Sequence, residues 1–154
     1  MERRLFLKST LAGSAIAVAA GAGLLSPKSV MAAWPENAFG PRPLNDSMNA
    51  LFGSSSAEAS SAIEITAPDI AENGAVVPIT VETTLSNIDS IALMVAAADS
   101  PLVANFALGS TAGGMVATRI KMASSSDVVA VVNAGGKLYS AQRQVQVTVG
   151  GCGG

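Results

Sequence analysis

The sequence of 154 residues contains no histidine, one cysteine and only six aromatic residues. Histidine is the commonest general base and the commonest metal ligand in proteins, so its absence removes both roles. One cysteine excludes an internal disulfide and a thiolate-rich zinc site. A Ser-His-Asp or Cys-His catalytic unit cannot be assembled from this chain alone. We therefore expect no catalytic residue, no metal site and no cofactor.

Charged residues are scarce, at 13% of the sequence, whereas 49% is hydrophobic. This balance favours a packed core over disorder, and small aliphatic residues in such numbers suit a β-rich core. The first 32 residues carry a net charge of +3, so subtracting +3 from the total of −2 leaves −5 on the rest. That sign is wrong for nucleic acid or an anionic membrane surface, and we expect no stable association with either.

The first 32 residues have the pattern of an export signal. Arg3-Arg4 and Phe6-Leu7-Lys8 precede a weakly apolar run from Leu11 to Leu25, and small residues follow at Val30-Met31-Ala32. This order resembles a twin-arginine signal, with cleavage near Ala32. A membrane anchor is the alternative, but these 15 weakly apolar residues are fewer than the roughly 20 that a spanning helix needs. We expect a periplasmic protein that is exported already folded.

The chain after the leader changes composition along its length. The stretch from Trp34 to Pro43 is rich in proline and polar residues and is expected to be irregular. Asn45 or Asp46 can cap a short helix that runs to about Phe52 and stops at Gly53. We predict four parts, a signal peptide, an N-terminal extension with a short helix, a β-sandwich and a C-terminal arm, which cover residues 1–32, 33–60, 61–149 and 150–154.

The third part is a succession of short β-type runs. Ile63 and Ile65 alternate with polar neighbours, and the run from Ile88 to Ala98 is mostly apolar, as expected of a central strand. The predicted strands are 63–66, 76–85, 88–98, 102–108, 115–123, 127–133 and about 142–149. About seven strands with no recurring helices favour an all-β, antiparallel, immunoglobulin-like sandwich over a parallel α/β sheet.

Turn residues separate several of these strands. Asn73-Gly74 is expected to supply the positive-φ residues of a tight turn, and Gly135-Gly136 makes another. Pro78 cannot donate to a ladder, so it marks an edge or a bulge. The final strand is expected to point three side chains inward, namely Val145, Val147 and Val149.

The last five residues of the sequence carry its chemistry. They are Gly150, Gly151, Cys152, Gly153 and Gly154. Four glycines leave the backbone almost unrestricted, so a flexible arm is expected directly after a well-patterned strand. From Val149 to Cys152 such an arm extends roughly 10 Å. The thiol can therefore enter a narrow channel in another protein.

A thiolate is a soft nucleophile that forms and breaks bonds to sulfur. A free cysteine has a pKa of about 8.5, so only a minor thiolate fraction exists near neutrality, and activation must come from a partner. This favours a carrier over an enzyme. The alternative is a frayed tail with an incidental cysteine. We interpret Cys152 as the site of covalent substrate attachment and the four flanking glycines as its carrier arm.

The sequence resembles the SoxY family, the sulfur-carrier subunits of the bacterial Sox thiosulfate-oxidation system. The resemblance rests on the Gly-Gly-Cys-Gly-Gly tail and the twin-arginine leader, and it covers essentially the whole chain. The other segments that fit are Val147 to Val149, Thr118 to Ala123, Gly135 to Tyr139 and Asn73-Gly74 to Pro78. The resemblance implies an immunoglobulin-like sandwich paired with a second sandwich subunit, SoxZ, which is exported with it.

The resemblance also implies a set of enzyme partners. A c-type haem complex, SoxAX, would join thiosulfate oxidatively to Cys152. SoxB, a dimanganese hydrolase, would release the terminal sulfonate as sulfate. A molybdenum and haem enzyme, SoxCD, would oxidise the remaining sulfur where it is present. The carrier itself would need no cofactor.

Two other readings of the sequence stay open. One is a ubiquitin-like sulfur carrier that holds sulfur as a thiocarboxylate on Gly154, and the other is an exported sandwich whose Cys152 forms an intermolecular disulfide. The sequence does not decide the preferred sulfur species, the presence of a SoxCD-like enzyme or the oligomeric state beyond a heterodimer. Nor does it decide whether Arg119 and Lys121 contact substrate, partner or solvent.

Overall fold

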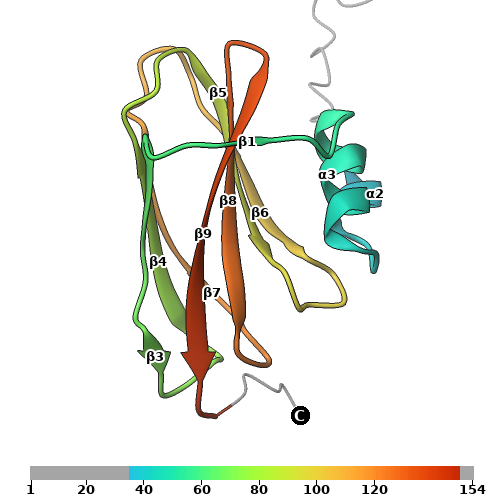
Figure 1. The fold of residues 1–154 in the computed structure, drawn as a ribbon, viewed down its shortest axis with the longest axis vertical. Coiled ribbons are helices and arrows are strands. Elements are labelled where there is room, and N and C mark those ends of the chain that lie inside the picture. Colours follow the sequence, from blue (N-terminus) through green and yellow to red (C-terminus); the bar gives the residue numbers. More distant parts are fainter. Residues whose placement is uncertain (1–34, 150–154) are drawn as a thin grey trace, which may run out of the picture. The chain divides into compact units, whose positions relative to one another are not determined.

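The computed structural model describes residues 35–149 as two packed β-sheets with two short helices (Figure 1). The predicted signal peptide and carrier arm lie outside these residues. The helices and strands in chain order are α2 (Glu36–Phe39), α3 (Leu44–Phe52), β1 (Glu58–Ala59), β2 (Ile63–Thr66), β3 (Ile70–Ala71), β4 (Val77–Thr83), β5 (Ile88–Val95), β6 (Leu102–Ala107), β7 (Met115–Ile120), β8 (Ser126–Ala134) and β9 (Lys137–Val147).

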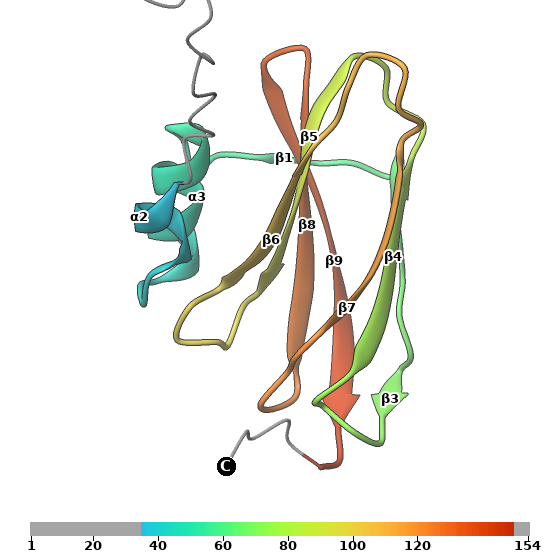
Figure 2. The ribbon, with the colours of Figure 1, turned by 180° about the vertical axis from the view of Figure 1, so that it is seen from behind.

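The larger sheet has the strand order β1-β9-β8-β5-β6, with β3 also paired to β9, and the smaller has the order β2-β4-β7. Both sheets can be followed from the opposite side in Figure 2. The pairs among the seven strands of four residues or more are antiparallel, whereas the two-residue strands β1 and β3 run parallel to β9. This arrangement is an immunoglobulin-like sandwich, which confirms the predicted fold class.

The core explains which strands alternate and which are apolar throughout. In β4 only every second residue, such as Val77, Ile79 and Val81, is buried, because one face of that strand meets the other sheet. In β8 almost every residue is buried. Val128 faces the inter-sheet core and Val131 faces a second cluster under the helices, so this strand is covered on both faces. The predicted central position of β5 is confirmed, since it lies between β8 and β6.

The short helix α3 ends at Phe52, as expected. Gly53 follows at φ 73°, and its N–H donates to the Asn49 carbonyl at 2.8 Å. The predicted cap was wrong, because the helix begins after Pro43 and no side chain caps it.

The helix α2 lies within the stretch that was expected to be irregular, so that expectation was also wrong. Ala38 of this helix is fully buried in the same cluster as Met48, Met94 and Leu102. Burial against the sheet therefore orders four residues whose local sequence predicts no helix.

The two predicted glycine turns have different outcomes. Gly135 and Gly136 have φ values of 57° and 78°, as a tight β8–β9 hairpin turn requires. Neither Asn73 nor Gly74 has a positive φ, so the expected turn type there was wrong. Instead, the Asn73 Oδ1 accepts a hydrogen bond from the Ala75 N–H at 2.8 Å, which is an Asx-type turn.

Pro78 lies in the middle strand of the smaller sheet, not at its edge. The β2 ladder covers only residues 80–83 of β4, so beside Pro78 the strand pairs with β7 alone. The missing N–H therefore falls where one side of the strand has no ladder partner.

The final strand differs from its prediction at both ends. It begins at Lys137, about five residues earlier than expected, because it pairs with β8 from the hairpin onward. Val145 is fully buried and Val147 half-buried, but Val149 is 63% exposed. The predicted inward direction of Val149 was wrong, since this residue lies beyond the last β8–β9 pair, Ser126 with Val145.

Candidate functional site

The predicted attachment residue, Cys152, and its flanking glycines lie outside the described residues. The structure describes where the chain leaves the sandwich toward them. We call the end of β9, Arg143–Val149, and the segment beside it, Asp69–Val76, the arm root. β3 lies next to the end of β9 within this arm root (Figure 1).

Backbone hydrogen bonds join the two segments of the arm root. The Gln146 N–H donates to the Asp69 carbonyl at 2.9 Å, and the Thr148 N–H donates to the Ala71 carbonyl at 3.1 Å. These bonds continue the parallel pairing of β3 with β9. The Thr148 hydroxyl also donates to the Glu72 carbonyl at 3.1 Å. These bonds therefore hold the chain one residue past the end of its last strand, at Thr148.

Gly74 makes the final contact of this series. Its N–H donates to the Val149 carbonyl at 2.8 Å, while its own carbonyl accepts a bond from the Met122 N–H at 2.7 Å. Gly74 and Met122 are both buried. One residue thus connects the last described residue, Val149, to the segment that follows β7.

The opposite side of β9 is held by a side chain. The Ser125 Oγ accepts a hydrogen bond from the Val147 N–H at 2.8 Å, just beyond the end of the β8 ladder. Because β9 is bonded on both sides here, Val147–Val149 has a fixed position on the sandwich. In the sequence two glycines, Gly150 and Gly151, separate Val149 from Cys152.

An ion pair lies at the start of the arm root. Arg143 Nη2 and Asp69 Oδ1 are 2.8 Å apart, with side chains 41% and 87% exposed. An exposed pair of this kind contributes about 0–1 kcal/mol to stability, so it adds little to the backbone bonds that join the two segments.

The roles of Arg119 and Lys121 were left open by the sequence, and the structure gives them different neighbours. Both Arg119 and Lys121 are exposed. Lys121 immediately precedes Met122, which is bonded to Gly74, whereas Arg119 lies opposite Pro78 in the β4–β7 ladder. Within residues 35–149, neither of them takes part in the one ion pair that is present.

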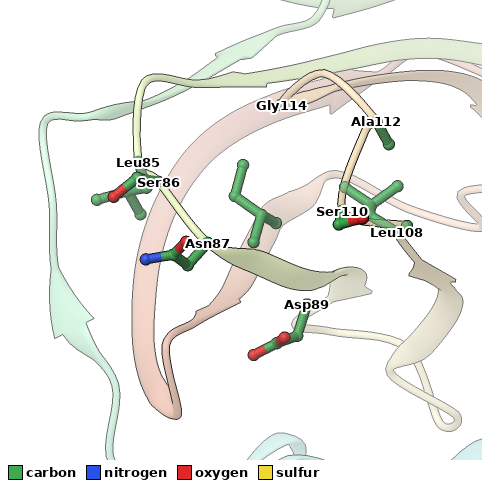
Figure 3. Close-up of a pocket in the computed structure, with 10 residues that line it drawn as sticks. Leu85, Ser86, Asn87, Asp89, Leu108, Ser110, Ala112 and Gly114 are labelled. Carbon is green, nitrogen blue, oxygen red and sulfur yellow. The ribbon is translucent and has the colours of Figure 1, made fainter.

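A hollow in the described part of the chain lies away from the arm root. It has a volume of about 400 Å³ and is lined by residues 85–89 and by the loop between β6 and β7 (Figure 3). Strand β7 runs from this hollow, at Gly114, toward Met122 at the arm root. Asn87 and Asp89 lie on one side of the hollow and Leu108 and Ser110 on the other.

Residues 35–149 contain neither a metal-binding cluster nor a helix that could span a membrane. No group of three or more aspartate, glutamate, histidine or cysteine side chains is placed to hold a metal ion there. In the same range no helix is both long enough and apolar enough to cross a membrane.

The sequence did not predict that the segment Asp69–Val76 bonds to the end of β9. The contacts of Asp69, Ala71, Glu72 and Gly74 with β9 all use backbone atoms of this segment, apart from the Asp69 carboxylate. A backbone contact leaves no side-chain pattern, so the only signal available was the Asn73-Gly74 turn.

Comparisons with known proteins agree with this geometry. The family model for sulfur oxidation protein SoxY matches residues 48–152. The structure of the sulfur carrier protein SoxY from Chlorobium limicola f thiosulfatophilum is similar, with 45% sequence identity and a TM-score of 0.63, and the match covers 69% of this chain and 96% of that one.

A second solved structure is similar in fold alone. It is the superoxide reductase neelaredoxin from Ignicoccus hospitalis, at 18% identity and a TM-score of 0.50, with 55% of this chain and 78% of that chain covered. A comparison with curated proteins gave no match.

Proposed function

This chain belongs to the SoxY family of sulfur oxidation proteins, and on that basis we propose that it is a periplasmic sulfur carrier. In this proposal Cys152 holds thiosulfate-derived intermediates covalently while partner enzymes act on them. The observation that carries the proposal is the family match, which extends to Cys152, the one cysteine of the sequence. The anchored arm root supports it, because a carrier needs a fixed base for its reactive group.

The loading step uses only the sulfur of the carrier. The Cys152 thiolate and the outer sulfur of thiosulfate would form a disulfide bond, and the two electrons released would be accepted, one at a time, by the haem chemistry of a SoxAX-like complex. The product is a cysteine thiosulfonate. Its formation requires no general base on the carrier, which is consistent with a sequence that has no histidine.

The unloading step breaks a different bond. Water attacks the sulfonate sulfur in a SoxB-like dimanganese hydrolase, and the bond between the two outer sulfurs breaks. Sulfate leaves, protons pass to solvent and a persulfide stays on Cys152. A SoxCD-like molybdenum and haem enzyme would oxidise that persulfide sulfur further.

Export and assembly complete the proposal. The twin-arginine leader would carry the folded chain, bound to a SoxZ-like sandwich subunit, to the periplasm. Cleavage near Ala32 would leave the helices and the sandwich intact, since the described elements begin at Glu36.

Intact mass and peptide mapping test the proposal. The mature chain, bound to its partner subunit, is incubated with thiosulfate and the haem complex and then digested with trypsin. We expect a thiosulfonate on the peptide that contains Cys152 and none in a Cys152→Ser variant. A thiocarboxylate on Gly154, or a disulfide-linked dimer with no added sulfur, would contradict the proposal and favour one of the two other readings.

A further inference from the structure

Large hydrophobic side chains are exposed at four positions of residues 35–149. They are Ile70, Val76, Met115 and Val149, with exposed fractions of 56%, 55%, 58% and 63%. Three of the four belong to the arm root, whereas Met115 begins strand β7 at the other end of the sandwich. Exposed hydrophobic side chains that gather at one end of a molecule often mark an interaction site.

Contacts of the backbone bring these three residues to the same end of the molecule. Ile70 is paired with Gln146 in the parallel β3–β9 ladder. Val76 lies two residues after Gly74, which is bonded to Val149. We call the side chains of Ile70, Val76 and Val149 the root patch.

The charges around the root patch are few and mixed in sign. Asp69 is already paired with Arg143 at 2.8 Å. The other exposed charged side chains nearby are Glu72, Lys121, which precedes the Gly74-bonded Met122, and Arg119, which is paired with Pro78. Together with the ion pair they leave an excess of one positive charge, and so small a net charge favours apolar contact over electrostatic attraction.

The length of chain beyond Val149 determines what must come close to the root patch. Cys152 is three residues further on, and three extended residues span at most about 10 Å. An enzyme that takes the sulfur of Cys152 into its active site must therefore place the rim of that site within about the same distance of Val149. The surface that it meets there is the root patch.

We propose that the root patch is the docking surface for the enzyme that receives the Cys152 adduct, and that this enzyme surrounds its active-site entrance with apolar side chains. The inference rests on the proposed carrier function, because it assumes an adduct on Cys152. Its chemistry is specific: the partner is a protein with a narrow pocket and an uncharged, apolar rim. The 63% exposure of Val149 then has a function, since its side chain would be covered only during turnover.

Paired serine substitutions test the proposal. The carrier, bound to its partner subunit and loaded with thiosulfate, is the substrate, and the rate of sulfate release by the hydrolase is measured. We expect an Ile70→Ser, Val76→Ser double variant to raise the KM for the carrier about tenfold with kcat nearly unchanged. Met115→Ser is the matched control, because it removes an equally exposed side chain at the other end, and it should leave KM unchanged.

Further measurements separate the possible failures. Labelling of Cys152 by a small thiol reagent and the melting temperature should be the same in all variants. A normal KM for the double variant would overturn the docking surface alone, and so would a change only in sedimentation, which would mean that a second copy or the partner subunit covers the patch. Absence of any adduct on the wild-type Cys152 would instead overturn the carrier function itself.

Discussion

Single residues of the arm root differ in how they hold the chain. Gly74 and Thr148 each bond across the two segments, but Gly74 uses its backbone alone and Thr148 adds its hydroxyl. Only the hydroxyl can be removed without changing the backbone, so Thr148 is the residue through which the anchor is best tested.

Replacing Thr148 with valine should loosen the arm root without unfolding the protein. The change keeps the shape of the side chain and removes the hydrogen bond to the Glu72 carbonyl, which is worth about 0.5–1.5 kcal/mol. We expect faster amide exchange at Thr148 and at Gly74. Thr66→Val is the control, since Thr66 is an exposed strand threonine whose hydroxyl makes no hydrogen bond in the described part of the chain. Equal amide exchange rates in both variants would show that the backbone hydrogen bonds alone hold the arm root in place.

The sequence pointed to Cys152 but not to the position of the chain that leads to it. The prediction for Cys152 rests on a local pattern, one thiol among glycines, and it stays a prediction because this residue lies outside the described range. The position of Val149 depends instead on whether an opposing strand reaches it, and β8 ends its pairing at Val145. Alternation along the final strand continues past that point, so it predicted a buried side chain where the structure has an exposed one.

Among the elements, the strands with regular alternation were the easiest to predict. β2 and β7 bury every second residue, a period that a strand with one covered face requires. β3 has only two residues and pairs in parallel with a strand about 75 residues later, so no local signal exists for it. The same holds for α2, whose order depends on burial of Ala38.

The C-terminal strand should show a sharp difference between its two valines. Val145→Ala removes fully buried methyl groups and should lower the free energy of unfolding by about 2 kcal/mol. Val149→Ala removes methyl groups from a side chain that is 63% exposed and should change it by less than about 0.5 kcal/mol. Urea denaturation of both variants is the measurement. A comparable loss in Val149→Ala would mean that this residue is buried after all.

Larger side chains beside Cys152 should slow the reaction with partner enzymes without changing the reactivity of the thiol itself. Replacing Gly151 and Gly153 with valine adds branched side chains on both sides of the thiol, which a narrow active site would exclude. We expect slower unloading by the hydrolase and an unchanged rate of labelling by a small thiol reagent. If turnover stays at the wild-type rate, the receiving site is wide and the glycines beside Cys152 are not needed for entry.

At the scale of the whole molecule, the buried side chains of the described residues lie between Ala38 and Val145. The first described element begins at Glu36, after the predicted leader. We therefore expect that substitutions in the predicted leader and at Cys152 leave the stability of the sandwich unchanged.

The leader should control location without affecting the fold. Replacing Arg3 and Arg4 with lysine preserves the charge but removes the paired guanidinium groups of a twin-arginine signal. We expect the precursor to accumulate uncleaved in the cytoplasm, as shown by fractionation and its larger mass. Lys28→Arg is the control and should be exported normally. Normal export of the double lysine variant would indicate another route.

The hydrogen bonds that anchor the last described residues come mostly from peptide groups. The neighbouring side chains therefore contribute little to holding this part of the chain in place. Positions 70, 72 and 76 are consequently open to substitution while the thiol keeps its starting point. To redirect a carrier of this kind to a different oxidase, positions 70, 72 and 76 are the ones to randomise, while Gly74 is kept.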